Sequence, residues 1–202
     1  MSEALRRRPA QRRGAARVDR LLDACGLVLD DVGFDGLTTR AVAERAGSSI
    51  GSFYQFFDDK MGLVSAFGQR NLNRYVADIN ARFAADPPDG WSAMLDTVLD
   101  AYIEHRRTVP GFGVIDFALL GDGDASARLA EHLAGLIERH LGVAESVNLL
   151  RALRVAVEAA DALIRLAFRE DQSGAPAVLA ETKRMISGYL ATYLDGATAT
   201  DR

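Results

Sequence analysis

Cysteine is nearly absent from this sequence, since Cys25 is the only one in 202 residues. A single cysteine excludes a disulfide within the chain and suits a reducing compartment. No apolar run reaches the roughly 18 residues that a membrane-spanning helix requires. The basic N-terminus also lacks the apolar segment of a signal peptide. We therefore expect a cytoplasmic protein with no segment in a membrane.

Catalytic and metal-binding patterns are missing as well. No paired carboxylates, no nucleophile beside a base and no metal-ligand spacing rise above background. Residues 121–124, Gly-Asp-Gly-Asp, superficially resemble a calcium loop, but the third acidic position and the closing Glu are absent. His132 and His140 are too far apart on one helix for a single metal site without other ligands. We predict no enzymatic activity, no metal and no cofactor.

An excess of positive charge is also absent, because the formal net charge of the chain is −4. This excludes a protein that coats nucleic acid over its whole surface. Positive charge is instead concentrated in residues 1–20, which contain seven arginines, Arg12 and Arg13 among them. We predict that residues 1–16 form a flexible basic arm that follows DNA, with a solubilising tail as the alternative.

What the sequence does contain is apolar residues at helical spacing. They recur in nine segments: 17–32, 38–47, 50–56, 60–83, 91–107, 112–120, 125–141, 144–169 and 176–194. Glycine and proline separate many of these segments, as at Gly33 and at Pro110-Gly111. Cys25 falls within the apolar stripe of the first segment, so we expect it to be a core residue. The pattern predicts an all-α protein of about nine helices.

The pattern of residues 38–60 predicts a helix-turn-helix. Thr38 suits the N-cap of the first helix, and Gly47 suits the left-handed residue that ends it. Either of the two serines that follow can cap the short second helix, and Asp58 can cap the next one.

Polar residues on the short second helix suit contacts with DNA. Ser and Tyr hydroxyls can bind phosphates, and Gln can bind adenine through two hydrogen bonds. Gly51 would let the backbone approach a partner closely. We assign phosphate contacts to Thr39, Ser48, Tyr54 and Lys60, and base contacts to Ser49, Gly51, Ser52 and Gln55. The alternative is an ordinary helical hairpin whose polar face is solvated.

This segment resembles the DNA-binding domain of the TetR family of transcriptional repressors. The family pattern joins a Thr-capped helix, an Ala-Gly pair, a Ser or Thr turn, a Gly-x-x-Tyr-x-x-Phe helix and a Lys. The matching residues are Thr39, Ala46-Gly47, Ser48-Ser49, residues 51–57 and Lys60. Phe56 stands where the family often has His, and Ser48 where Val is frequent.

The resemblance implies two domains, with residues 17–62 for DNA binding and residues 63–202 for ligand binding and dimerisation. It implies a homodimer joined through the last two helices, and two-fold symmetry then favours a near-palindromic double-stranded DNA operator. It also implies repression that a small-molecule effector releases. The helix over residues 60–83 would link the two domains mechanically.

Candidate effector contacts are aromatic, aliphatic and polar residues on the middle helices. They are Phe67, Asn71, Tyr75, Trp91, Met94, Tyr102, Phe112, Ile115, Phe117, Leu120, Glu158 and Asp161. Most of these residues are first of all core formers. The aromatic bias favours an apolar or planar effector.

A charged stripe on the helix over residues 144–169 is open to two interpretations. Its members share one face at steps of three and four residues: Arg151, Arg154, Glu158, Asp161 and Arg165. Either this face is solvated, with ion pairs that contribute about 0.2–0.5 kcal/mol each, or part of it borders a pocket or the dimer interface.

Two other classes of function stay open. One is a helical-bundle enzyme or small-molecule carrier, and the other is a helical protein–protein interaction module that no longer binds DNA. The basic arm and Lys60 argue against the module. A steep fall of DNA affinity with salt would distinguish a DNA-binding protein from both.

Overall fold

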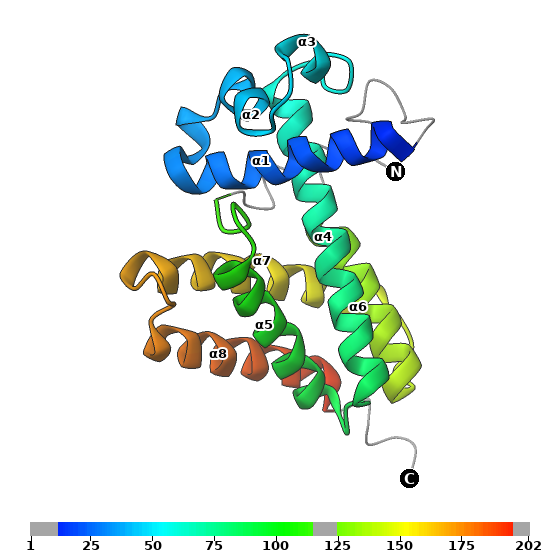
Figure 1. The fold of residues 1–202 in the computed structure, drawn as a ribbon. Coiled ribbons are helices and arrows are strands. Elements are labelled where there is room, and N and C mark those ends of the chain that lie inside the picture. The colour runs from blue at the N-terminus through cyan, green and yellow to red at the C-terminus, as the bar shows by residue number, and fades with distance from the viewer. Residues whose placement is uncertain (1–11, 115–124, 196–202) are drawn as a thin grey trace. The chain divides into compact units, whose positions relative to one another are not determined.

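The computed structural model describes residues 12–114 and 125–195, and every regular element in these ranges is an α-helix. In chain order the helices are α1 (Arg12–Gly36), α2 (Thr39–Arg45), α3 (Ile50–Phe53), α4 (Lys60–Ala85), α5 (Trp91–Thr108), α6 (Ala125–Leu141), α7 (Val147–Glu170) and α8 (Pro176–Leu194) (Figure 1). The predicted all-α class is confirmed. None of the described helices is both long enough and apolar enough to cross a membrane.

The number of helices in the described ranges is one fewer than predicted. The missing element is the segment 112–120, which begins in a turn at residues 112–114. The rest of that segment lies outside the described residues.

Helix α1 begins at Arg12, five residues before the predicted start. The prediction of a flexible arm is therefore wrong for residues 12–16, while residues 1–11 lie outside the described ranges. Arg and Ala dominate residues 12–16 and are strong helix formers, so the helix continues through Gly14. Near its other end α1 is interrupted as predicted, because Gly33 has a left-handed φ of 69°.

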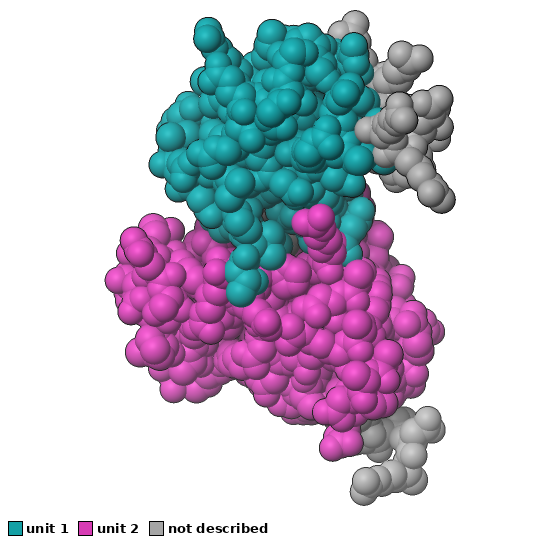
Figure 2. Space-filling view, viewed as in Figure 1, with its two compact units in different colours: residues 1–73, 108–123 teal, residues 74–107, 124–202 magenta. Residues whose placement is uncertain are grey.

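The described residues group into two compact units (Figure 2). Unit 1 contains residues 12–73 and 108–114, and unit 2 contains residues 74–107 and 125–195. Helix α4 contributes its first part to unit 1 and its second part to unit 2. The domain boundary at residues 62/63 stays a prediction.

The core of unit 1 is built from one face of each of its helices. Its buried side chains include Leu21, Leu22, Cys25 and Leu29 of α1, Val42 of α2, Phe53 of α3, and Leu63, Val64 and Phe67 of α4. Cys25 is a core residue as predicted, and burial raises the pKa of its thiol to about 12. Such a thiol stays protonated at neutral pH and is a poor nucleophile.

The turn over residues 109–114 packs directly against α1 within unit 1. The Gly111 amide donates a hydrogen bond to the Asp30 carboxylate over 2.8 Å. Gly26 permits the close approach, because a Cβ atom at that position would lie 2.5 Å from the carbonyl oxygen of Pro110. Position 26 of α1 therefore requires glycine.

Helix α8 begins as predicted, because Pro176 occupies its first turn.

Polar contacts link α5 to α8 in unit 2. Lys183 of α8 pairs with Asp100 of α5 at 2.8 Å. The indole N–H of Trp91, at the start of α5, donates to Asp195 over 2.9 Å, just beyond the end of α8. These two contacts hold α8 to α5 at two separate places.

Candidate nucleic-acid interface and effector site

The predicted helix-turn-helix is present in unit 1. The Thr38 hydroxyl accepts a hydrogen bond from the Ala41 amide over 3.1 Å and caps α2. Gly47 has a φ of 61°, the left-handed conformation that ends a helix. The Ser49 hydroxyl accepts from the Ser52 amide over 3.2 Å and caps α3. Of the two candidate serines, the second is therefore the cap.

Helix α3 is a single turn, shorter than the predicted 50–56, and aromatic residues anchor it. Phe53 and Phe57 are completely buried, and their ring centroids lie 5.5 Å apart. Phe56 is buried as well, so an apolar anchor stands where the family pattern often has histidine. This packing holds α3 against the core of unit 1. The face of α3 opposite these aromatic residues is therefore presented in a defined orientation.

The cap of α4 differs from the prediction by one residue. The Asp59 carboxylate accepts from the Gly62 amide over 2.8 Å, so Asp59 is the capping residue and the prediction of Asp58 is wrong. A cap directly precedes the first helical residue, and α4 begins at Lys60.

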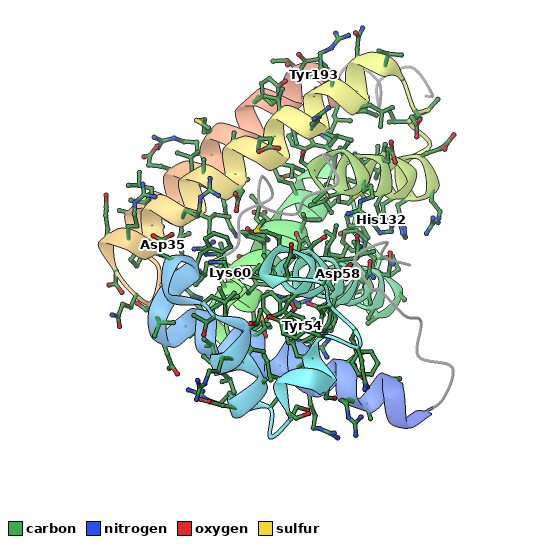
Figure 3. All side chains as sticks on the ribbon, turned by 90° about the horizontal axis from the view of Figure 1, so that it is seen from above. Asp35, Tyr54, Asp58, Lys60, His132 and Tyr193 are labelled. Atoms are coloured by element: carbon green, nitrogen blue, oxygen red, sulfur yellow. The ribbon has the colours of Figure 1, made fainter. Side chains whose placement is uncertain are left out.

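One face of α3 points away from the core of unit 1. If the rotation of about 100° per residue is continued into the turn after α3, four residues follow each other around this side: Ile50 of α3, Tyr54 of the turn, Gly51 of α3 and Gln55 of the turn. All four are exposed. Three of them are predicted DNA contacts, and Tyr54 is labelled in Figure 3. We call these four residues the outer face of α3.

Ser52 does not belong to the outer face. Around the helix it lies next to the buried Phe53, and its hydroxyl oxygen is covered and has no hydrogen-bond partner among the described residues. A helix packed on a core must turn one side inward, and helical periodicity places Ser52 on that side. The base contact of Ser52 stays a prediction.

Thr39 and Tyr54 bring two predicted phosphate contacts together. Their hydroxyl oxygens lie 3.4 Å apart, one on α2 and the other directly after α3. Ser48 is half-buried in the turn between the two helices. Arg12 and Arg13 lie at the start of α1. The DNA contacts of these residues stay predictions.

The side chain of Lys60 contacts another residue of unit 1, Phe34. Its ammonium donates a hydrogen bond to the carbonyl of Phe34 over 3.2 Å and lies 4.4 Å from the centroid of the Phe34 ring (Figure 3 labels Lys60). Sequence reasoning missed this contact because the two residues are 26 positions apart. An ammonium has three donors, so the predicted phosphate contact of Lys60 stays possible and stays a prediction.

Three of the predicted effector contacts meet in unit 2. The Tyr102 hydroxyl donates to the buried Asp161 carboxylate, and Arg165 pairs with the other oxygen of that carboxylate at 2.7 Å. The Tyr75 and Tyr102 rings lie edge to face, with centroids 5.6 Å apart. Burial and then the charge of Asp161 raise the pKa of Tyr102 well above its ordinary value. Tyr102 therefore keeps its proton and remains a hydrogen-bond donor.

The burial of Asp161 shows that the charged stripe on α7 is not one solvated face. The Asp161 side chain is only 3% exposed, whereas Arg151, Arg154 and Glu158 are exposed. A carboxylate can be buried at this position because a hydroxyl and a guanidinium satisfy it. The effector contact of Glu158 stays a prediction.

A second charged cluster in unit 2 was missed by sequence reasoning. Arg82 pairs with Asp78 at 3.0 Å and with Glu104 at 2.6 Å, and His105 lies 3.2 Å from Asp78. Burial acts to raise the pKa of Asp78, but the hydrogen bonds and charges of Arg82 and His105 outweigh it and hold the pKa below its usual value. The i, i+4 spacing of Asp78 and Arg82 could have predicted their ion pair from the sequence. No sequence pattern indicates that Glu104 and His105 of α5 join them.

The remaining effector candidates are dispersed. Phe67, Asn71 and Phe112 belong to unit 1, whereas Trp91 and Met94 belong to unit 2. Ile115, Phe117 and Leu120 lie outside the described residues. Asn71 is buried, and its Oδ1 atom has no hydrogen-bond partner within the described ranges. No three His, Cys, Asp or Glu side chains in those same ranges gather as metal ligands.

Two family descriptions match the chain. Residues 21–67 match "Bacterial regulatory proteins, tetR family", and residues 90–190 match "Tetracyclin repressor-like, C-terminal domain". The chain belongs to the TetR family of transcriptional regulators. The predicted family is thus confirmed, and with it the predicted class of a helix-turn-helix transcriptional regulator.

Solved structures share the fold of this TetR-family chain. A TetR-family transcriptional regulator from Streptomyces coelicolor is 43% identical, with a TM-score of 0.80 over 88% of this chain and 99% of that one. The fatty acid degradation regulator FadR from Bacillus halodurans is 14% identical, with a TM-score of 0.66 over 84% and 97% of the two chains. At that identity the likeness shows the fold alone.

A curated relative is also a regulator of transcription. The HTH-type transcriptional regulator BetI of Stenotrophomonas maltophilia is 31% identical over 91 residues. The match covers 45% of this TetR-family chain and 46% of BetI, so it spans about half of the relative's length.

Proposed function

We propose that this TetR-family protein is a cytoplasmic repressor that binds a near-palindromic DNA operator as a homodimer. The observation that supports this best is the outer face of α3, which is exposed opposite the buried Phe53. Aromatic anchors hold this face in a fixed orientation, and recognition of base edges in a major groove requires such an orientation.

The residues around α3 divide into two kinds of DNA contact in this proposal. Base contacts belong to Ser49, Gly51 and Gln55, whose positions are exposed. Phosphate contacts belong to Thr39, Ser48, Tyr54 and Lys60, with Arg12 and Arg13 adding positive charge from α1. Phosphate contacts set the register of the protein on DNA, and base contacts select the sequence.

Dimerisation through α7 and α8 is supported by the apolar side chains that these two helices expose. Val147 and Val155 of α7 and Met185 and Tyr193 of α8 are large apolar residues in contact with solvent. Burying them against the same helices of a second copy would remove this surface from water and create a two-fold interface. Sedimentation equilibrium tests the interface, and a monomer at micromolar concentration would contradict it.

The proposed effector is a small molecule with an aromatic or apolar body that contacts Tyr75 and Tyr102. In support, the two rings already meet edge to face, a packing that an aromatic effector could extend. An effector of this kind releases the operator only by the difference between its affinities for the released and the DNA-binding conformations.

Fluorescence anisotropy tests operator binding. Duplexes from the regions that flank the protein's own coding region are titrated over a salt series, with scrambled duplexes as the control. We expect affinity about a thousandfold above the control, and a linear fall of log affinity with log salt concentration. Weak and equal binding to both sets would contradict recognition of these regions and favour a protein–protein interaction module.

A further inference from the structure

An apolar side chain, Ile50, stands at the start of the outer face of α3. It is 43% exposed, although the other exposed side chains of this face are the polar Tyr54 and Gln55. The backbone carbonyl of Ile50 already accepts from the Tyr54 amide. The side chain of Ile50 can offer a partner only apolar contact.

The neighbouring Gly51 leaves open space beside Ile50. A Cβ atom built on Gly51 meets no atom of the described residues within 4 Å. Gly51 is also absent from the glycines with positive φ in the described ranges. Nothing in the fold therefore requires glycine here, and alanine would raise the helix propensity. The missing side chain would let a partner approach the backbone closely from outside.

The major groove contains one apolar group that isoleucine can contact, the C5 methyl of thymine. Phosphates and the other base edges are polar, so covering Ile50 with them would remove apolar surface from water without an apolar partner. We propose that Ile50 is a specificity-determining residue that packs against a thymine methyl in each half of the operator, and that Gly51 admits the DNA to that distance. This inference rests on the proposed DNA-binding function.

The hydrogen bonding of Ser49 is compatible with the same base. Its hydroxyl oxygen accepts from the Ser52 amide, so the hydroxyl hydrogen remains for an external acceptor. The O4 atom of thymine is such an acceptor and lies on the same groove edge as the methyl. An apolar side chain and a hydroxyl donor in adjacent positions thus fit the two major-groove groups of thymine.

The test replaces thymine by deoxyuridine, which lacks only the methyl. Wild-type protein first selects its site from a pool of randomised duplexes, and each thymine of the enriched site is then replaced in turn. We expect one position in each half-site where the replacement weakens wild-type binding about fourfold, the effect of exposing one methyl-sized apolar group. The variant Ile50→Ala should bind the thymine and deoxyuridine duplexes equally at that position.

A matched control separates this effect from a general loss of apolar surface. Leu27 on α1 is 42% exposed, and Leu27→Ala should keep the full deoxyuridine penalty. Gly51→Ala should remain as stable as wild type and lose affinity for the enriched site. A penalty in Ile50→Ala equal to that of wild type would overturn the role of Ile50 while leaving DNA recognition intact. If no sequence is enriched, the proposed function itself fails, and this inference fails with it.

Discussion

The ammonium of Lys60 donates to the carbonyl of Phe34 and lies over the ring of the same residue, 4.4 Å from its centroid. Phe34 is near the end of α1, and Lys60 is the first residue of α4. The chain between them contains α2 and α3. One side chain therefore joins the two ends of the segment that contains α2 and α3.

Replacing Lys60 by methionine removes the charge and keeps most of the stem. We expect the loss of the charged hydrogen bond to lower the Tm by about 2–4 °C, the effect of about 1 kcal/mol in a chain of this size. If Lys60 also binds a phosphate, the slope of log affinity against log salt should flatten by about one. Lys183→Met is the control, since Lys183 pairs within unit 2. An unchanged slope with a lower Tm would make Lys60 a purely structural residue.

Gln55→Ala tests base recognition on the outer face of α3. We expect operator affinity to fall by about 1–3 kcal/mol, because a bidentate contact to a base is lost, with little change on scrambled DNA. Anisotropy titrations of both duplexes measure the difference. Gln172→Ala, in the exposed turn between α7 and α8, should bind like wild type. Equal losses on both duplexes would remove Gln55 from the base contacts.

Gly47→Ala should lower the stability of the protein, whereas Gly51→Ala should not. Among the residues that the structure describes, none lies within 4 Å of a Cβ atom at either position, so the two sites differ in backbone conformation. Gly47 has a φ of 61°, where an alanine costs about 1–2 kcal/mol. Gly51 lies in a helical turn, where an alanine is neutral or stabilises by up to about 1 kcal/mol. Urea unfolding measures both variants, and equal midpoints would refute this account of the turn.

Asp161 and Glu158 lie on the same helix and should differ sharply in their effect on stability. Asp161→Ala leaves Tyr102 and Arg165 without their shared acceptor, and we expect a loss of about 2–4 kcal/mol in the free energy of unfolding. Glu158→Ala removes an exposed carboxylate and should change the free energy of unfolding by less than about 0.5 kcal/mol. Chemical denaturation at neutral pH compares the two, and similar values would contradict the buried cluster.

The same cluster predicts a loss of stability at alkaline pH. Burial raises the pKa of Tyr102 in the folded protein, so the folded state keeps a proton that the unfolded chain releases above about pH 10. The contribution of Tyr102 to the free energy of unfolding is fully present below that pH and is lost as the pH rises further. The free energy of unfolding should therefore fall above about pH 10, and fall less steeply in Tyr102→Phe. Identical pH profiles would rule out this contribution.

The features that sequence reasoning predicted well have local causes. Thr38, Gly47 and Ser49 act on groups within a few residues of themselves, so their roles can be derived from spacing and residue type. Pro176 at the start of α8 is predictable for the same reason. The inward side of α3 was predictable in principle, since periodicity alone separates Ser52 from Gly51 and Gln55.

The features that it missed depend on partners far away in the chain. Asp161 is buried because Tyr102, 59 residues away, supplies a hydrogen bond, and no local pattern distinguishes it from the exposed Glu158. Helix α1 started before its predicted first residue because local helix propensity outweighed the expectation of a flexible basic tail. The sequence could not divide the effector candidates into core residues and pocket residues, because apolar periodicity marks both alike.

The hydrogen bond between Trp91 and Asp195 places an intrinsic fluorescent probe at a known position in the protein. Trp91 is the only tryptophan in the chain, so intrinsic fluorescence originates from a single known place. That place is the junction between the start of α5 and the end of α8. Emission will shift when the indole loses this partner and becomes hydrated. Movement of α8, whether on assembly or on binding of a small molecule, can thus be followed without attaching a dye.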